Sequence, residues 1–356
     1  MKNNVADIYE LTPLQQGMLY HTLSTPQSAV YNMQMDYALE GELDVDALEQ
    51  SWKLILDRHD VLRTAFVWAG VAKPYQVVHR SSQLNIAQYD WRGMPASEQQ
   101  QKILSFVTED RARAFDLSKP GLIRLSLITR DETHYRFVWT FHHIILEGWS
   151  AAILAGEFWK AYHELRSQRS PGLPPVRRYA EYISWLKQQD QAKAEAYWRE
   201  KLKDFKAASV LPIDKATTGE EAQVVNVDVY RDELTQEQTR ALRELARKNR
   251  VTLNTVVQGL WAVLLGRYTG ETDILFGAAL SGRPPDLSGA ESIVGLFVNV
   301  LPVRVKISPD EPVFSWLQQL QLDQAVMRQY EYSSLMQVKS WSELPSGQPL
   351  FQTVLG

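Results

Sequence analysis

The chain contains no cysteine among its 356 residues. This absence excludes disulfides, cysteine nucleophiles, Cys-type zinc sites and iron–sulfur clusters. It fits a reducing compartment, and we expect a cytoplasmic protein. A large charge excess is also missing, because 42 acidic residues face 38 basic ones and the net charge is −4. That balance argues against a nucleic-acid partner, which usually needs a basic face.

Long apolar runs are missing as well. No stretch approaches the roughly 18 apolar residues of a membrane-spanning helix. The N-terminus, MKNNVADIYE, has no apolar signal core after its lysine, so we expect neither a membrane partner nor secretion. Aromatic residues are abundant instead, with 11 Trp. They suit the walls of binding channels as well as ordinary core packing.

Helical and strand patterns alternate along the chain, which predicts a mixed α/β (α+β) fold. In the first half we predict helices over 43–59 and 150–165 and strands over 122–128 and 135–141. Ser150 is the predicted N-cap of the second helix. The Pro/Gly cluster SPGLPP at 170–175 predicts a linker. We therefore divide the chain into domains 1–175 and 176–356.

The second half repeats this mixed character. We predict helical segments over 179–203, 235–248, 252–268 and 312–329, and strands over 223–230, 273–280 and 296–305. Thr235 and Gln238 have the spacing of a capping box. Gly270 is placed to end the helix over 252–268.

The sharpest local feature is Phe141-His142-His143-Ile144-Ile145-Leu146-Glu147-Gly148-Trp149-Ser150. If the preceding strand stays extended, His143 points to its aromatic side and His142 to the other. Two rings on opposite faces chelate a metal poorly, the nearest acid is Glu147, and there is no HExxH pattern. We therefore expect no metal site.

A neutral imidazole at a strand end can accept a proton from a substrate at physiological pH. The alternative is that His142 and His143 are both satisfied core residues, and the local pattern leaves both interpretations open. A serine-hydrolase elbow and a Walker-type loop are both missing from the sequence.

Several strings together resemble the condensation domains of nonribosomal peptide synthetases. His142-His143-x-x-x-Glu147-Gly148 resembles their HHxxxDG motif. Five further strings match family motifs in the family's order: LTPLQQGM at 11–18, RHDVLRTAF at 58–66, Tyr179 to Trp185, VGLFVN at 294–299 and QPLF at 348–351. The resemblance extends over about residues 7–356.

The resemblance implies two lobes like chloramphenicol acetyltransferase, arranged as a V-shaped pseudo-dimer with a tunnel at the junction. Donor and acceptor peptidyl carrier proteins would deliver thioesters on phosphopantetheine arms, and the acceptor amine would attack the donor thioester to form an amide. An adjoining adenylation domain is a further expected partner. We expect no cofactor bound by the domain itself.

Two departures from the family pattern stand out. Glu147 occupies the position of the motif's aspartate. The chain also ends soon after the QPLF string, whereas family members continue for some tens of residues. The resemblance therefore implies an incomplete C-terminal lobe, which bears on whether this chain is active.

By the resemblance, His143 is the catalytic histidine, acting as a general base on the acceptor amine or positioning it by a hydrogen bond. An α-ammonium titrates near about 8, so free amine is already present and we favour positioning with proton relay. His142 is expected to be structural. Glu147 is expected to brace the loop by pairing with an arginine, with Arg283 as first candidate and Arg63 as second.

Other residues near the motif carry two interpretations each. Gly148 either leaves room for a pantetheine arm or permits a tight turn, and it is counted among the catalytic positions. Trp149, Ser150 and Asn299 are candidates for the tunnel lining. For Trp149 the alternative is helix packing, and for Asn299 it is a structural hydrogen bond.

Two other functions remain open. A free coenzyme A-dependent acyltransferase would share the fold and the histidine motif, although the RHDVLRTAF and VGLFVN strings favour the synthetase. A non-catalytic recruitment module would tend to lose the histidine pair, which is kept here. The amino acids joined and the donor's chirality cannot be read from the sequence.

Overall fold

The computed structural model describes residues 4–26, 28–206, 211, 229–345 and 347–356. The chain divides into two compact units. The first comprises Met1–Gln188 and Arg283–Phe297, and the second comprises Gln189–Gly282 and Val298–Gly356. No pattern in the sequence indicated that Arg283–Phe297 would group with the first unit. The lobe boundary between residues 175 and 176 stays a prediction.

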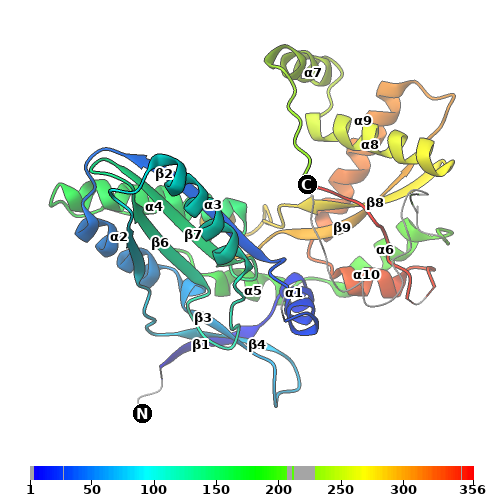
Figure 1. The fold of residues 1–356 in the computed structure, drawn as a ribbon. Coiled ribbons are helices and arrows are strands. Elements are labelled where there is room, and N and C mark those ends of the chain that lie inside the picture. The colour runs from blue at the N-terminus through cyan, green and yellow to red at the C-terminus, as the bar shows by residue number, and fades with distance from the viewer. Residues whose placement is uncertain (1–3, 27, 207–210, 212–228, 346) are drawn as a thin grey trace. The chain divides into compact units, whose positions relative to one another are not determined.

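Helices and strands alternate in the first unit, as predicted (Figure 1). Its elements are β1 (Val5–Glu10), α1 (Pro13–Ser24), β2 (Asn32–Glu40), α2 (Val45–Arg58), η1 (Asp60–Arg63), β3 (Thr64–Val67), β4 (Tyr75–His79), β5 (Ile86–Asp90), α3 (Ala96–Ala112), β6 (Ile123–Thr129), β7 (His134–His142), α4 (Gly148–Arg166), α5 (Tyr179–Lys187) and η3 (Ala290–Ser292). The strands form one sheet of order β2-β7-β6-β5 and another of order β1-β4-β3. Within the larger sheet only β5 and β6 run parallel.

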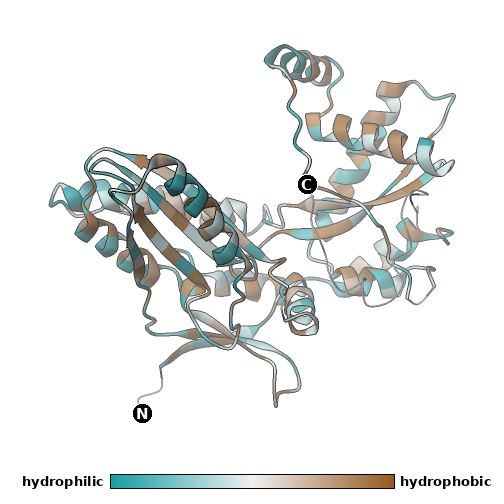
Figure 2. Cartoon of the chain, in the orientation of Figure 1, coloured by the Kyte–Doolittle hydropathy of each residue, from teal (hydrophilic) through white to brown (hydrophobic). Residues whose placement is uncertain are grey.

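One face of β7 builds the core of this unit. Alternate residues from Tyr135 to Phe141 are aromatic, and hydrophobic positions recur along the central strands in Figure 2. The Trp139 ring lies 4.7 Å from that of Trp52 on α2 and 5.5 Å from that of Phe158 on α4. These three side chains are almost wholly buried, and such aromatic pairs add to the free energy of area burial. The predicted aromatic face is therefore the face that α2 and α4 cover.

The opposite face of β7 holds a polar cluster centred on Asp110 of α3. Its carboxylate accepts from Arg124 Nε at 3.0 Å, from Arg113 Nη2 at 2.7 Å and from the Thr140 hydroxyl. Asp110 is buried, so these partners offset the cost of removing its charge from water. The cluster fixes the end of α3 on the strand that leads to the histidine pair.

The second unit contains α6 (Gln191–Leu202), α7 (Gln236–Lys248), α8 (Leu253–Thr269), β8 (Asp273–Leu280), β9 (Asn299–Lys306), α9 (Val313–Met327), η4 (Arg328–Tyr330), α10 (Leu335–Trp341) and β10 (Val354–Leu355). Its sheet has the order β10-β8-β9, with β10 parallel to β8. Thr235 and Gln238 form the predicted capping box. Gly270 ends α8 at φ +75°, as predicted, a conformation that favours glycine.

Some predicted elements differ from the structure. The segment 179–203 is two helices rather than one, because Asp190 caps a new helix by accepting from Lys193 N. Ser150 is not an N-cap: α4 begins at Gly148, with Glu147 at the cap position. The strand predicted over 223–230 falls mostly outside the described residues. Within the described part of the chain, no helix combines the length and apolarity that crossing a bilayer requires.

Candidate functional site

The histidine pair lies where β7 gives way to α4. His142 is the last residue of the strand, and residues 143–145 form a turn. The extended geometry therefore stops before His143, so the condition under which His143 was expected to continue the aromatic face is not met. The turn forms because its backbone is tied to the end of β7: Ile145 N donates to His142 O at 3.2 Å.

His142 has the burial and contacts that a structural residue would have. Its ring is 3% exposed; Nδ1 accepts from Ile144 N at 3.1 Å, and Nε2 lies 3.4 Å from the Thr22 hydroxyl. This pattern places the proton of the neutral ring on Nε2. Burial, helped by the neighbouring His143, lowers the pKa of His142 from 6.5 to about 4. The ring is therefore neutral at physiological pH and holds the turn.

His143 has a different environment. Its backbone N–H donates to Tyr31 O at 2.8 Å, which fixes the residue against the start of β2. Its side chain is only partly buried, yet Nδ1 is buried and has no hydrogen-bond partner among the described residues. Nε2, unlike Nδ1, is not among the buried side-chain atoms that lack a partner. An imidazole held by its backbone and free at one nitrogen can accept or relay a proton.

The predicted ion pair between Glu147 and Arg283 is present. Arg283 Nη2 lies 2.6 Å from Glu147 Oε1, and the two side chains are 7% and 3% exposed. Burial raises the pKa of Glu147, while the contact with Arg283 opposes that rise. Removing one partner of such a pair leaves an uncompensated charge, which commonly costs about 3–5 kcal/mol.

Arg283 also organises the segment Arg283–Phe297 of the first unit. Its Nη1 donates to Ala290 O and Ile293 O, and its guanidinium lies 4.1 Å from the centre of the Phe297 ring. Ser150 joins the same cluster: its hydroxyl accepts from Arg283 Nη2 at 2.9 Å. One arginine therefore ties the start of α4 to the segment that contains most of the VGLFVN string.

Ser150 and Gly295 make a second link between α4 and that segment. The Ser150 hydroxyl donates to Gly295 O at 2.6 Å and accepts from Gly295 N at 3.0 Å. A Cβ on Gly295 would lie 2.2 Å from the Tyr179 ring, so only glycine fits there. Ser150 is fully buried and has these partners, which is the environment of a bracing residue. Apart from the motif strings, nothing in the sequence indicated a role for Gly295 or Tyr179.

The remaining predicted site residues occupy distinct places. Gly148 is exposed, has no positive φ, and a Cβ added there would meet nothing within 4 Å. Trp149 is 55% exposed, with its Nε1 donating to Glu291 O at 3.0 Å. Asn299, in the second unit, is buried and donates to Glu331 O and Ser333 O at 2.7 Å each. Its contacts are those of the structural alternative.

Arg63, the second candidate for Glu147, has other partners. Its guanidinium donates to Leu56 O at 2.9 Å, to Asp57 O at 3.1 Å and to Asp60 Oδ1 at 3.0 Å. Leu56 and Asp57 lie at the C-terminal end of α2, where the last carbonyls of a helix need partners, and Asp60 lies in η1. Arg63 therefore caps α2 and does not contact Glu147.

One polar residue at the turn was missed from the sequence. Gln15 on α1 donates from Nε2 to Ile144 O at 3.0 Å. Thr12 and Gln15 also form a capping box, with Gln15 Oε1 accepting from Thr12 N at 2.9 Å. The capping-box spacing was the available signal, but it predicts only a helix start and not a contact 129 residues away.

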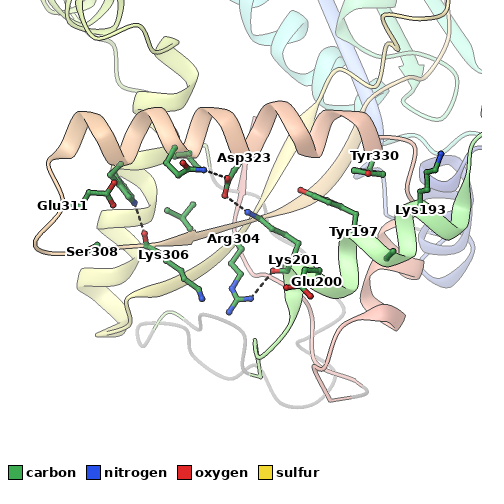
Figure 3. A pocket seen from close by; sticks show the side chains of 15 residues that line it. Lys193, Tyr197, Glu200, Lys201, Arg304, Lys306, Ser308, Glu311, Asp323 and Tyr330 are labelled. Atoms are coloured by element: carbon green, nitrogen blue, oxygen red, sulfur yellow. Dashed lines mark hydrogen bonds and ion pairs between the residues drawn. The ribbon is translucent and has the colours of Figure 1, made fainter.

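The second unit has a groove of its own, shown in Figure 3. It has a volume of about 780 Å³ and is lined by α6, the end of β9 and α9. Lys201 Nζ lies 2.6 Å from Asp323 Oδ2 across it, and the Tyr197 and Tyr330 rings stack with centres 4.3 Å apart. His143 is not among its lining residues. Within the described residues, no group of three His, Cys, Asp or Glu side chains could hold a metal ion.

The chain is similar to known proteins over almost its whole length. The family model described as "Condensation domain" matches residues 5–356. The chain is 42% identical over 356 residues to a linear gramicidin synthase protein of Brevibacillus parabrevis, covering 99% of this chain and 7% of that protein. It is 36% identical to surfactin synthase subunit 3 of Bacillus subtilis (strain 168), covering 97% of this chain and 27% of that protein. The chain thus spans a small part of the length of these relatives.

Solved structures share the fold. A starter condensation domain of rhizomide synthetase, crystallised with C8-CoA, superposes with a TM-score of 0.80 at 20% identity and covers 98% of this chain and 78% of that chain. The first condensation domain of the calcium-dependent antibiotic synthetase gives 0.78 at 19% identity, covering 99% and 80%. These likenesses confirm the mixed α/β fold. With the family model matching almost throughout, the chain belongs to the condensation domain family of nonribosomal peptide synthetases, the amide-bond-forming enzymes of that machinery.

Proposed function

We propose that this chain joins a donor acyl or peptidyl thioester to an acceptor aminoacyl thioester, both held on the phosphopantetheine arms of carrier proteins. The observation that carries the proposal is the contrast within the histidine pair. His142 is buried with both ring nitrogens near partners, whereas His143 is partly exposed on a braced turn and its Nδ1 has no partner among the described residues.

In the proposed reaction, the free acceptor amine donates a hydrogen bond to His143 Nε2. The amine nitrogen attacks the donor carbonyl carbon, so a C–N bond forms and the C–S bond breaks. The ammonium proton passes to His143 and from there to the leaving thiolate, which becomes the pantetheine thiol. The imidazole is regenerated and atoms balance. Because free amine is already present near neutral pH, His143 contributes mainly orientation and proton relay.

The residues around His143 act by holding the turn. The Glu147–Arg283 pair and Ser150 fix the start of α4, and Gly148 leaves open space beside it. We propose that this open space admits a pantetheine arm, since neither φ nor packing requires glycine there. As the resemblance implies, we further propose two acetyltransferase-like lobes in a V. Carrier proteins would bind on either side, and an adenylation domain would adjoin in the complete synthetase.

The direct test is to incubate the chain with loaded donor and acceptor carrier proteins and follow the intact masses. We expect the donor's acyl group to move to the acceptor carrier. The acceptor carrier then gains the mass of that acyl group less one hydrogen, and the donor carrier loses it. A second reaction replaces the donor carrier by the same acyl group on coenzyme A. Equal rates would favour the free acyltransferase, and no transfer in either reaction would contradict the catalytic proposal.

A further inference from the structure

We infer that Gln15 is a positioning residue for His143, an inference that rests on the proposed function of that histidine. Gln15 lies in the first turn of α1 and is 1% exposed. Its amide reaches the turn that carries His143, although Gln15 itself does not face substrate.

One carbonyl of the turn, that of Ile144, has Gln15 as its hydrogen-bond donor. The three N–H groups of the turn have other partners, since His143 N donates to Tyr31 O, Ile144 N to His142 Nδ1 and Ile145 N to His142 O. The Ile144 carbonyl accepts from Gln15 Nε2 at 3.0 Å. Ile144 is wholly buried, so water cannot replace a lost donor. A buried carbonyl without a partner costs about 1–3 kcal/mol, and the turn would shift to recover a hydrogen bond.

The Gln15 amide is held on its other sides. Its Oε1 accepts from Thr12 N at 2.9 Å and from Gln76 Nε2 at 2.8 Å, and Gln76 also donates to Glu10 O at 3.1 Å. Gln76 lies on β4 and Glu10 ends β1. The amide is therefore fixed by the smaller sheet and by the start of α1, and it transfers that rigidity to the His143 turn. A polar network of this kind is worth most when every member is satisfied.

The test is Gln15→Met, which keeps the side-chain length and removes the amide. The matched control is Gln324→Met, because Gln324 is also a buried amide paired with a glutamine, Nε2 lying 2.7 Å from Gln258 Oε1 in the second unit. A misplacement of about 1 Å can cost about a hundredfold in rate. We expect kcat to fall about tenfold or more in Gln15→Met, with KM for both carriers within about twofold, and to stay within about twofold in Gln324→Met.

A second readout separates positioning from general loosening. In Gln15→Met, hydrogen exchange at the His143 and Ile144 amides should speed up about tenfold or more, while exchange along β5 and β6, to which Gln15 makes no hydrogen bond, stays unchanged. In a His143→Ala background, Gln15→Met should have no further effect on the residual rate, because both changes act on one group.

Three outcomes overturn the inference while leaving the proposed function intact: an unchanged kcat in Gln15→Met, an equal loss in Gln324→Met, or faster exchange that is uniform over the unit. If His143→Ala is as fast as the wild type, the proposed function fails instead. Should Gln15→Met not fold, Gln15→Glu keeps the acceptor contacts to Thr12 and Gln76 and, once its carboxyl is ionised, gives up donation to both Ile144 O and Gln76 Oε1. The same expectations apply to it.

Discussion

Two carboxylates at helix α4, Glu147 at its N-cap position and Glu157 within it, are each paired with an arginine, yet their surroundings differ. Glu157, ten residues further along the chain than Glu147, accepts from Arg58 Nε at 2.8 Å and lies 2.7 Å from His59 Nε2. Burial pushes the pKa of Glu157 up, but these hydrogen bonds outweigh it and leave the pKa below its ordinary value. Glu147 is more deeply buried, and burial wins there, so its pKa is raised. The balance between burial and the hydrogen bonds made to each carboxylate decides the sign of its pKa shift.

This difference suggests what each cluster is for. The Glu157 cluster holds the end of α2 against α4. The Glu147 cluster holds a carboxylate that is costly to ionise beside the His143 turn. We infer that this cost is offset because the cluster fixes the position of the turn. The comparison therefore predicts that the Glu157 cluster affects stability alone, whereas the Glu147 cluster affects stability and rate.

Substituting the arginines should have the largest effect on the free energy of unfolding. Arg283→Met leaves Glu147 buried without its partner and should lower the free energy of unfolding by about 3–5 kcal/mol. Arg58→Met leaves Glu157 with His59 and some exposure to solvent, so we expect a loss nearer about 1 kcal/mol. Urea unfolding of both variants measures the difference. Equal losses would mean that the two clusters are equivalent.

A second comparison uses the carboxylates themselves. Glu147→Gln should lower the unfolding free energy by about 1–3 kcal/mol and the rate of amide formation by up to about a hundredfold, because the buried guanidinium loses its charge partner and the turn shifts. Glu157→Gln should cost stability while leaving the rate within about threefold. Single-turnover kinetics with loaded carriers checks both. Full thermal stability in Glu147→Gln with no turnover would favour a direct chemical role for Glu147.

Glu147 and Glu157 should change the pH dependence of stability in opposite directions. The lowered pKa of Glu157 means that its stabilising contribution is present above its unfolded pKa of about 4.5 and is lost as the pH falls through the folded value. The raised pKa of Glu147 acts oppositely: its contribution is favourable below about pH 4.5 and is lost as the pH rises through the folded value. From pH 7 to 4, Glu157→Gln should therefore lose less stability than the wild type, and Glu147→Gln should lose more. The reverse order in urea titrations would refute the assignment.

The smallest expected effect on stability is at Gly148. Because an added Cβ meets nothing within 4 Å, Gly148→Ala should change the unfolding free energy by no more than about 0.5 kcal/mol. If the space admits a pantetheine arm, KM for a loaded carrier should rise or kcat should fall. Thermal melts with parallel kinetics separate the two interpretations of Gly148. A large loss of stability would support the tight-turn interpretation. Unchanged kinetics would contradict the proposal that a pantetheine arm passes beside Gly148.

Local signals in the sequence predicted much of this fold. Alternating aromatics located β7 and its buried face, Thr235 and Gln238 marked the start of α7, and Gly270 marked the end of α8. What failed locally was the start of α4, where the Ser150 hydroxyl bonds to Gly295, 145 residues away, instead of capping the helix. Contacts of that range depend on packing that no local pattern encodes.

The candidate site divides in the same way. The histidine motif identified His142 and His143, and the family pattern suggested the partner of Glu147, 136 residues away. Gln15 and Tyr179 were missed because each acts through a backbone group, Ile144 O or Leu296 O. A carbonyl leaves no trace in the sequence, so a side chain that holds one cannot be paired with it by residue type.

The central claim is that His143 takes part in amide formation, and His143→Ala tests it most directly. Single-turnover amide formation between loaded carriers should fall about a hundredfold to ten-thousandfold, with carrier binding unchanged. A loss of about tenfold or less would assign the rate mainly to proximity and end the relay role. Wild-type amide formation by His143→Ala would contradict the account, and the site would then have to lie elsewhere.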